Sequence, residues 1–367
     1  MVIADAAPGD RVRTRSIAPD RPAKWNDIDI TRTQARDGWP VRIAGTGGYL
    51  PGVPIANSTY LEGRNFPTTA EWIEEHTGVE HRHHAGDDTA TSDLAAEAAR
   101  GALAAAGIEP SMVERIILCT TTGDWTSPAA ASRVQHLLGA QCPAVDVQAA
   151  CASWIFGLDM AIRLVATGLR NVLVIGADVK SRFVSSDDHR LGPVLADGAG
   201  AVVLDRHEGT GGFLQVELYT DGSKVGNLFT PAGGSAMPAS AETVAQQLHA
   251  TQLAIAGSEI KEHASFVMAE LSRQVCRQEG IEPSDVDWLV PHQANAAILR
   301  HLSRELEIDP ARIANTIARA GNIVAGTLPF SLDDLIRRGE IEPGQLILLV
   351  TAGAGYAGGV ALYEVPA

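Results

Sequence analysis

Three polar residues could together carry nucleophilic catalysis: Cys151, His292 and Asn322. Cys151 lies in the stretch 146–159, DVQAACASWIFGLD, where a small-residue approach is followed by a helical pattern from Ala152 onward. A cysteine at a strand-to-helix junction meets unpaired N–H groups and the positive end of the helix dipole, which both favour the nucleophilic thiolate. A free cysteine is more commonly a small buried hydrophobic residue, so this stretch alone leaves both interpretations open.

His292 and Asn322 carry little information when each is taken alone. His292 follows the apolar strand pattern 287–291, where a histidine is most simply a structural residue. Asn322 lies in a small-residue turn before an apolar helix, where an asparagine is most simply a turn former. Their significance depends on whether the fold brings them to Cys151.

An internal repeat relates these positions. The sequence Gly-Ile-Glu-Pro-Ser occurs twice, at 107–111 and at 280–284, each time after a helical pattern and before an apolar strand. Two pairs of strands then keep an offset of 173 or 174 residues. The pairs are 116–118 with 289–291, and 172–175 with 346–349. A five-residue identity followed by strands at a nearly constant offset predicts that the chain contains a duplicated α/β unit.

The repeat divides the chain into an N-terminal extension, residues 1–39, and two halves, residues 40–208 and 209–367. In each half, short continuous apolar strands alternate with helices, such as a helix over 92–106 that Ser92 can cap. This alternation predicts mainly parallel sheets that are buried on both faces.

The duplication also predicts where the polar residues meet. The 173-residue offset relates Cys151 to position 324, two residues from Asn322. We therefore expect Cys151 and the Asn322 loop to face each other across a pseudo-twofold axis, with His292 at a neighbouring strand end. Strand ends are where α/β folds place their sites, so the three residues together favour a functional site.

Composition and charge exclude several classes of protein. The chain has 367 residues, of which 45% are hydrophobic, and a net charge of −15, which argues against nucleic acid or an anionic membrane as partner. It shows no membrane-length apolar run and no signal-peptide core, so we expect a cytoplasmic location. Neither the four cysteines nor His81, His83 and His84 have zinc-site spacing, and no metal is expected.

Several motifs in order resemble the beta-ketoacyl-ACP synthase III (KAS III) branch of the thiolase superfamily, from about Val41 to the end of the chain. The motifs are Ala149-Ala150-Cys151-Ala152, Pro291-His292-Gln293-Ala294-Asn295, Gly321-Asn322 followed by Pro329, and Gly353-Ala354-Gly355. The resemblance implies a thiolase-like five-layer αβαβα fold built from the two duplicated halves, and a homodimer.

The resemblance also implies a reaction. Cys151 would take an acyl group from acyl-CoA, and His292 and Asn322 would bind the thioester carbonyl of a malonyl unit, on CoA or on an acyl carrier protein, as carbon dioxide leaves. The backbone N–H groups of Cys151 and Ala354 would form an oxyanion hole. The product would start a fatty acid or a polyketide, with no cofactor beyond the acyl-CoA substrate.

The CoA-binding positions that the resemblance implies are Trp72, Arg182, Ala294 and Asn295. The family pairs the tryptophan with an arginine four residues on, and here that position is His76. The alternative interpretation is that Trp72 is a core aromatic residue. Aromatic faces stack well on nucleic-acid bases, which favours a role in binding the adenine of CoA.

The acyl pocket departs from the family. In the family, a phenylalanine crosses the dimer interface and caps the acyl pocket of the partner subunit, and Ser127 stands at that position here. The nearby Trp125 can refill the space. Trp154 stands where the family usually has another phenylalanine. These changes favour a longer, branched or aromatic primer. The arginine with which the family docks its carrier protein is replaced here by Ala297, and a nearby family lysine is replaced by Glu262. Arg300 and Arg304 could supply the basic surface that an acidic carrier protein needs.

Two other functions compete with condensation. One is a KAS III-like acyltransferase that moves the acyl group from Cys151 to an alcohol or amine, with His292 as general base. The other is a non-catalytic subunit of a heterodimer, which the intact Cys151, His292 and Asn322 set disfavours.

Overall fold

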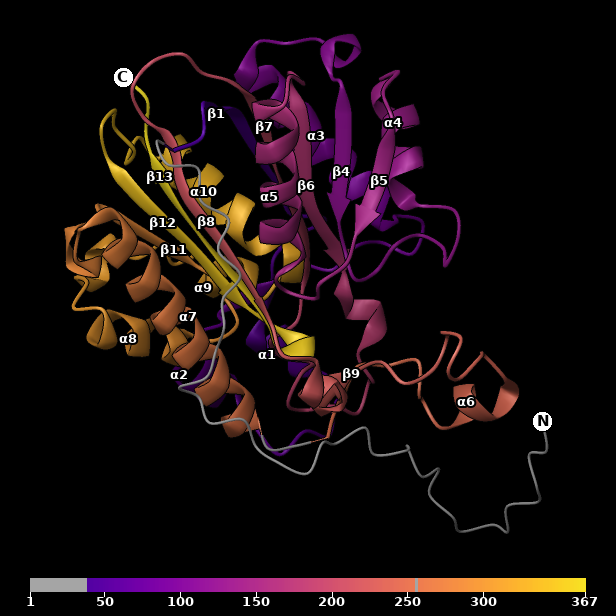
Figure 1. Ribbon diagram of the computed structural model, residues 1–367. Helices are drawn as coiled ribbons and strands as arrows, with labels where there is room; N and C mark the ends of the chain where they lie inside the picture. The colour runs from indigo at the N-terminus through magenta and orange to yellow at the C-terminus, as the bar shows by residue number, and fades with distance from the viewer. Residues whose placement is uncertain (1–37, 255–256) are drawn as a thin grey trace.

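The structure, a computed structural model, describes residues 38–254 and 257–367 (Figure 1). The expected N-terminal extension therefore lies outside the described residues except for its last two. Among the described residues, no helix is both long enough and apolar enough to cross a membrane.

Two sheets, one from each half of the chain, form the frame of the molecule. The first has the order β1-β7-β6-β4-β5, and the second has the order β11-β12-β13-β8. The strands of the first sheet are β1 (Val41–Tyr49), β4 (Arg115–Cys119), β5 (Ala144–Val147), β6 (Val172–Val179) and β7 (Asp197–Arg206). Those of the second are β8 (Gly212–Thr220), β11 (Trp288–Pro291), β12 (Leu346–Ala352) and β13 (Ala357–Glu364).

The second sheet repeats the order of the first, as the internal repeat predicts. Strands β8, β13, β12 and β11 take the places of β1, β7, β6 and β4. An isolated parallel bridge between Leu289 and Ile313 stands where β5 stands in the first sheet. The predicted duplication is confirmed at the level of topology.

The expectation of mainly parallel sheets is confirmed for strand direction, but each sheet also contains one antiparallel strand, β7 in the first and β13 in the second. In the first sheet, β4 pairs in parallel with β5 and β6, but β7 is antiparallel to both β1 and β6. In the second sheet, β11 pairs in parallel with β12, and β13 is antiparallel to both β12 and β8. The reason is that β7 and β13 return without a crossover helix, which a parallel connection requires.

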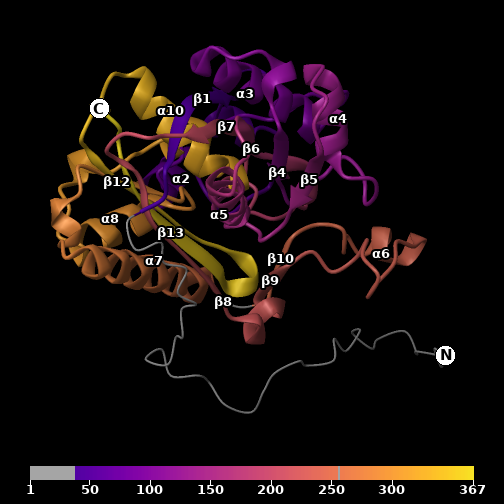
Figure 2. The same ribbon diagram turned by 45° about the horizontal axis from the view of Figure 1, so that its top comes forward.

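Helices complete a five-layer α/β arrangement, in which two helices lie between the sheets and two more cover each outer face (Figure 2). The central helices are α5 (Ser153–Ala166) and α10 (Thr327–Arg337). The outer helices are α3 (Thr91–Ala106) and α4 (Ala130–Leu138) on the first sheet, and α7 (Gly257–Glu279) and α8 (Ala296–Glu305) on the second. This is the five-layer arrangement that the resemblance implies.

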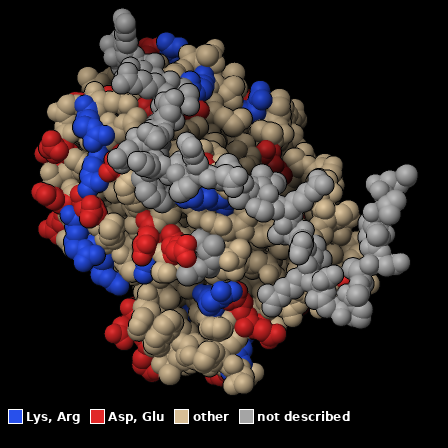
Figure 3. Space-filling view, turned by 60° about the horizontal axis from the view of Figure 1, so that its bottom comes forward, with Lys and Arg blue, Asp and Glu red and all other residues tan. Residues whose placement is uncertain are grey.

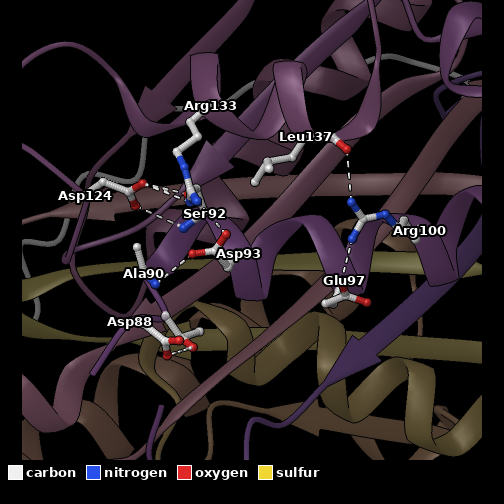
Figure 4. A network of polar contacts seen from close by, with 10 residues as sticks. Asp88, Ala90, Ser92, Asp93, Glu97, Arg100, Asp124, Arg133 and Leu137 are labelled. Atoms are coloured by element: carbon white, nitrogen blue, oxygen red, sulfur yellow. Dashed lines mark hydrogen bonds and ion pairs between the residues drawn. The ribbon is translucent and has the colours of Figure 1, made fainter. Parts of the chain in front are cut away.

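Helix α3 begins one residue before the predicted start, and Ser92 does not cap it. The backbone N–H of Ala90 donates to the Asp93 carboxylate at 2.8 Å. The Ser92 hydroxyl instead donates to Asp124 at 2.6 Å and accepts from Arg133 (Figure 4). This network holds the loop 120–129 against the start of α3.

Short elements and two long connections, residues 180–196 between β6 and β7 and residues 221–254 between β8 and α7, surround the frame. In Figures 1 and 2, α6 projects away from both sheets. The short helices and strands are β2 (Ile55–Ala56), α1 (Asn57–Leu61), α2 (Ala70–Thr77), β3 (His81–Arg82), η2 (Pro110–Met112), η3 (Lys180–Phe183), η4 (Gly222–Asn227), β9 (Leu228–Phe229), α6 (Ala241–Ala245), β10 (Gln252–Leu253), η5 (Pro283–Asp285), η6 (Pro310–Arg312), α9 (Ile317–Ala320), η7 (Val324–Gly326) and η8 (Ala354–Tyr356).

Candidate active site

Cys151 lies on a tight turn between β5 and α5. Ala150 has φ 52°, a left-handed conformation that is costly for a residue other than glycine. The Ser153 hydroxyl holds this turn, because it accepts from the N–H of Ala149 at 2.8 Å and donates to the carbonyl of Ala150 at 2.6 Å. The chain therefore maintains a strained backbone immediately before the cysteine.

The glycine-rich turn of the second half packs directly on Cys151. A Cβ atom at Gly353 would lie 2.7 Å from the Cβ of Cys151, so only glycine fits. The Thr351 hydroxyl donates to the carbonyl of Cys151 at 3.3 Å. The backbone N–H groups of Ala354 and Cys151 both interact with the thiol and lower its pKa. Burial of the thiol has the larger effect and raises the pKa of Cys151 to about 11.

His292 follows β11, and its environment leaves the imidazole free to bind a ligand. Its backbone N–H donates to the carbonyl of Val350 at 2.9 Å, one residue before Thr351. The residue is 1% exposed, and neither ring nitrogen has a hydrogen-bond partner among the described residues. Burial lowers the pKa of His292 to about 4, so the ring is neutral at pH 7, with one donor and one acceptor. Buried polar atoms without partners are rare and often mark a functional site.

Asn322 is fixed from both its backbone and its side chain. Its N–H donates to Val194 at 2.9 Å and its carbonyl accepts from Ala196 at 3.0 Å. The side-chain oxygen accepts from the N–H of Val324 at 2.9 Å. This bond directs the oxygen toward its own turn, so the NH₂ group faces the other way as a donor. Gly321, with φ +67°, supplies the backbone conformation that begins the turn.

Asp178, which the sequence reasoning missed, joins the two halves of the site. Its carboxylate accepts from the N–H of Thr121 at 2.8 Å and from the hydroxyls of Thr121 and Thr122 at 2.7 and 2.9 Å. The other oxygen accepts from the N–H of Ala325 at 3.1 Å. Burial raises the pKa of Asp178. A lone acidic residue at the end of the apolar strand LVIGADV is the signal that could have found it.

These contacts bring the predicted residues to one region between the sheets. His292 and Cys151 are joined through neighbouring residues of β12, because Val350 binds one and Thr351 binds the other. Helix α5, which follows Cys151, contacts η7, which follows Asn322. Helix α10 begins directly after η7, so η7 adjoins both central helices.

The predicted CoA-binding residues lie nearer the surface. Trp72 is 49% exposed, so its alternative assignment as a core aromatic residue is wrong. Its indole stacks on the His76 ring, with ring centroids 4.2 Å apart. Arg182 is exposed and donates to the carbonyl of Gly86. The Asn295 side chain caps α8 by accepting from the N–H of Ala297 at 2.8 Å, and Ala294, beside it, is half-buried.

The three predicted pocket residues lie in two places. Trp125 and Ser127 are exposed on the loop 120–129, and Trp154 is enclosed in the core between the sheets. A separate cavity of about 520 Å³ lies between residues 185–190 and residues 245–252 and includes none of the predicted site residues. The assignment of an acyl pocket to Trp125, Ser127 and Trp154 stays a prediction.

The chain matches three family descriptions. Residues 145–222 match 3-oxoacyl-[acyl-carrier-protein] synthase III, residues 276–365 match the C-terminal part of the same family, and residues 75–180 match the N-terminal domain of thiolase. A curated beta-ketoacyl-[acyl-carrier-protein] synthase III of Rhodospirillum rubrum is 40% identical, and the match covers 88% of this chain and 99% of the relative.

Solved structures agree with the sequence relatives. The 3-oxoacyl-[acyl-carrier-protein] synthase III of Aquifex aeolicus is 32% identical with a TM-score of 0.80, and the match covers 88% of this chain and 99% of that one. The priming beta-ketosynthase of the R1128 polyketide pathway is 25% identical with a TM-score of 0.81, and the match covers 92% and 99%.

The two packed sheets and the enclosed cysteine define an acyltransferase of the thiolase fold. Within that class, the chain belongs to the beta-ketoacyl-[acyl-carrier-protein] synthase III family.

Proposed function

We propose that this enzyme loads an acyl group from acyl-CoA onto Cys151 and condenses it with a malonyl thioester, releasing carbon dioxide. The observation that carries the proposal is the division of the site into two parts. The Cys151 thiol faces the backbone N–H groups of Cys151 and Ala354, while the neutral imidazole of His292 and the amide of Asn322 provide separate donors. An acyl ester and an enolate each need such donors.

In the first step, the Cys151 thiolate attacks the carbonyl carbon of acyl-CoA. A C–S bond to Cys151 forms, and negative charge develops on the carbonyl oxygen, which the two backbone N–H groups stabilise. The oxygen then reforms the carbonyl, and the C–S bond to CoA breaks. CoA leaves as a thiolate and takes a proton from solvent.

In the second step, the malonyl thioester loses carbon dioxide, and the electron pair of the broken C–C bond forms an enolate. His292 and Asn322 donate hydrogen bonds to the enolate oxygen without losing their protons. The enolate carbon attacks the acyl-Cys151 carbonyl, a C–C bond forms and the Cys151 C–S bond breaks. The β-ketoacyl thioester departs and the Cys151 thiolate is restored. In this scheme residues 40–208 supply the nucleophile, and residues 209–367 supply the enolate donors.

Surface residues support acyl-CoA and a carrier protein as partners. The stacked Trp72 and His76 rings present an aromatic surface for the adenine, and Arg182 is an exposed cation for a phosphate. On α8, Arg300 and Arg304 are exposed and suit an acidic carrier protein. In Figure 3, basic side chains form a line along one edge of the molecule, with acidic side chains beside them. We propose a cytoplasmic location for this reaction, which is consistent with these substrates.

The exposed edge of the first sheet supports a second copy of the chain as a partner. β5 is an edge strand of that sheet, and Val145 on it is 39% exposed. An unprotected edge is a template for pairing with another strand. Pairing through β5 would bring the exposed loop 120–129, with Ser127, toward the partner's site. We propose a homodimer with this interface.

The alternative acyl transfer to an alcohol or amine needs His292 as a general base. Burial lowers the pKa of His292 to about 4, which makes the ring a weak base near neutral pH but leaves it a good neutral donor. This favours the condensation.

Intact-protein mass spectrometry tests the loading step. Incubation with acyl-CoAs, from acetyl to long-chain and aromatic, should add one acyl mass to the wild type and none to Cys151→Ala. An adduct on another residue would exclude Cys151 as the nucleophile.

A further inference from the structure

A charged side chain is completely enclosed beside the Asn322 turn. Arg82, on β3, is 0% exposed, and within the part of the chain that the structure describes no carboxylate lies within 4.0 Å of its guanidinium. Taking a cation out of water costs free energy, and a close ion pair usually offsets that cost. Burial lowers the pKa of Arg82 to about 10, so the side chain is still charged at pH 7. Other contacts must therefore stabilise this charge.

The guanidinium joins separate segments of the chain through neutral oxygens. Its Nη1 group donates to the carbonyl of Ile55 at 3.0 Å. Its Nη2 group donates to the side-chain oxygen of Asn57 and to the carbonyl of Pro193, the latter at 3.0 Å. The guanidinium carbon lies 4.8 Å from the centre of the Tyr60 ring, whose face attracts a cation. Hydrogen bonds from charged donors are the strong ones, so Arg82 fixes Pro193 relative to β2 and α1.

The segment 193–196 holds the backbone of Asn322. The carbonyl of Val194 accepts from the N–H of Asn322 at 2.9 Å, and the N–H of Ala196 donates to the Asn322 carbonyl at 3.0 Å. These bonds make an isolated parallel bridge between Leu195 and Asn322. The position of the proposed enolate donor consequently depends on where this segment lies.

Residues of β3 and its end hold the segment at both of its ends. Arg82 binds it at Pro193, and the carbonyl of His83 accepts from the N–H of Asp197 at 2.9 Å. Arg82 also lies beside the turn itself, because a Cβ atom at Gly321 would lie 3.4 Å from the Cβ of Arg82. Arg82 and the proposed enolate donor therefore bind adjacent carbonyls of the same segment.

We propose that Arg82 is a positioning residue for condensation, because it fixes the segment 193–196 and, through this segment, the backbone of Asn322. A displacement of about 1 Å at a reacting group can slow a reaction about a hundredfold. Cys151 lies on the turn between β5 and α5, which the hydrogen bonds of Arg82 do not reach. The inference rests on the proposed function for the role of Asn322, but the contact can be tested without any substrate.

Hydrogen exchange in the full-length protein, followed by mass spectrometry of its peptides, tests the contact. Arg82→Met nearly keeps the length of the side chain and lacks the donors. The amides of Asn322 and Ala196 should exchange about tenfold faster in this variant, as expected for one lost hydrogen bond from a charged donor. Arg312→Met is the matched control. Arg312 also donates to two backbone carbonyls, at 2.9 and 3.2 Å, and neither belongs to the segment 193–196.

Single-turnover rates test the consequence for the reaction. Arg82→Met should load Cys151 at close to the wild-type rate and condense about tenfold more slowly. A partly unfolded protein would instead lose both rates in proportion, because the active fraction falls equally for both steps. Arg82→Lys keeps a charged donor without the planar fork, so its condensation rate should lie between those of the wild type and Arg82→Met. If Arg82→Met does not fold, Arg82→Lys should show the same split between the two steps.

The outcomes separate this inference from the proposed function. Equal slowing of both steps in a folded variant overturns the role of Arg82, and so does unchanged exchange at the two amides. If the wild type condenses in either case, the proposed function stands. Faster exchange at both amides in a protein whose wild type loads but does not condense would support the hold of Arg82 on Asn322 and contradict the proposed function.

Discussion

Asn322 uses one atom of its side chain for structure and leaves another for chemistry. Its oxygen accepts from the N–H of Val324, and its NH₂ group is the proposed enolate donor. Asn322→Asp keeps the acceptor but lacks the NH₂ donor, whereas Asn322→Ala loses both. Both variants should acylate Cys151 normally and condense about a hundredfold more slowly or worse, as for a lost oxyanion donor. Single-turnover loading and condensation rates check this, and slow loading with normal condensation would reverse the assigned roles.

His292 should give the enzyme a specific pH dependence of stability. Folding lowers its pKa from 6.5 to about 4, so the unfolded chain binds more protons between these pH values. The free energy of unfolding therefore falls by about 3 kcal/mol as the pH drops through this range, and this contribution is complete below pH 4. Urea unfolding at pH 7 and pH 4.5 should show a smaller difference for His292→Gln. The pKa of His263 is lowered similarly, but that residue is present in both proteins. Equal pH dependence in both proteins would show that His292 is not buried as a neutral ring.

At the scale of elements, the turn 353–356 connects the second half to the nucleophile. A Cβ atom at Gly353 would lie 2.7 Å from Cys151 Cβ and 2.9 Å from its N. Gly353→Ala should therefore move the cysteine turn, destabilise the protein by about 1–3 kcal/mol and slow acylation strongly. Gly222→Ala is the control, because a Cβ atom there meets nothing within 4 Å. Thermal unfolding and loading rates measure both effects, and normal loading by Gly353→Ala would show that the contact is unnecessary.

The sequence predicted those elements that depend on local pattern and on the repeat. The Gly-Ile-Glu-Pro-Ser identity located corresponding strands in both sheets, and the offset placed Asn322 beside the start of the other central helix. The direction of β7 and β13 was not predictable in this way, because a short apolar strand has the same sequence pattern whether it runs parallel or antiparallel to its neighbours. Asp178 was missed because its importance lies in contacts with Thr121, Thr122 and Ala325, which are distant from it along the chain.

At the scale of the whole molecule, the exposed edge of β5 should be the dimer interface. Val145→Lys places a charge on this edge and should weaken a second copy's pairing, as charged edge strands do. Analytical ultracentrifugation should show a dimer for the wild type and a shift toward monomer for the variant. Val225→Lys, on the exposed helix η4, is the control. A variant that remains fully dimeric would place the interface elsewhere.

The central claim is that one molecule performs loading and decarboxylative condensation. The most direct test isolates the protein acylated on Cys151 and adds malonyl-CoA or a malonyl carrier protein. We predict that the acyl adduct disappears, that one carbon dioxide is released per adduct, and that the product is longer by two carbons. An adduct that persists with the malonyl thioester and leaves only when an alcohol or amine is added would contradict the condensation and establish the simple acyl transfer.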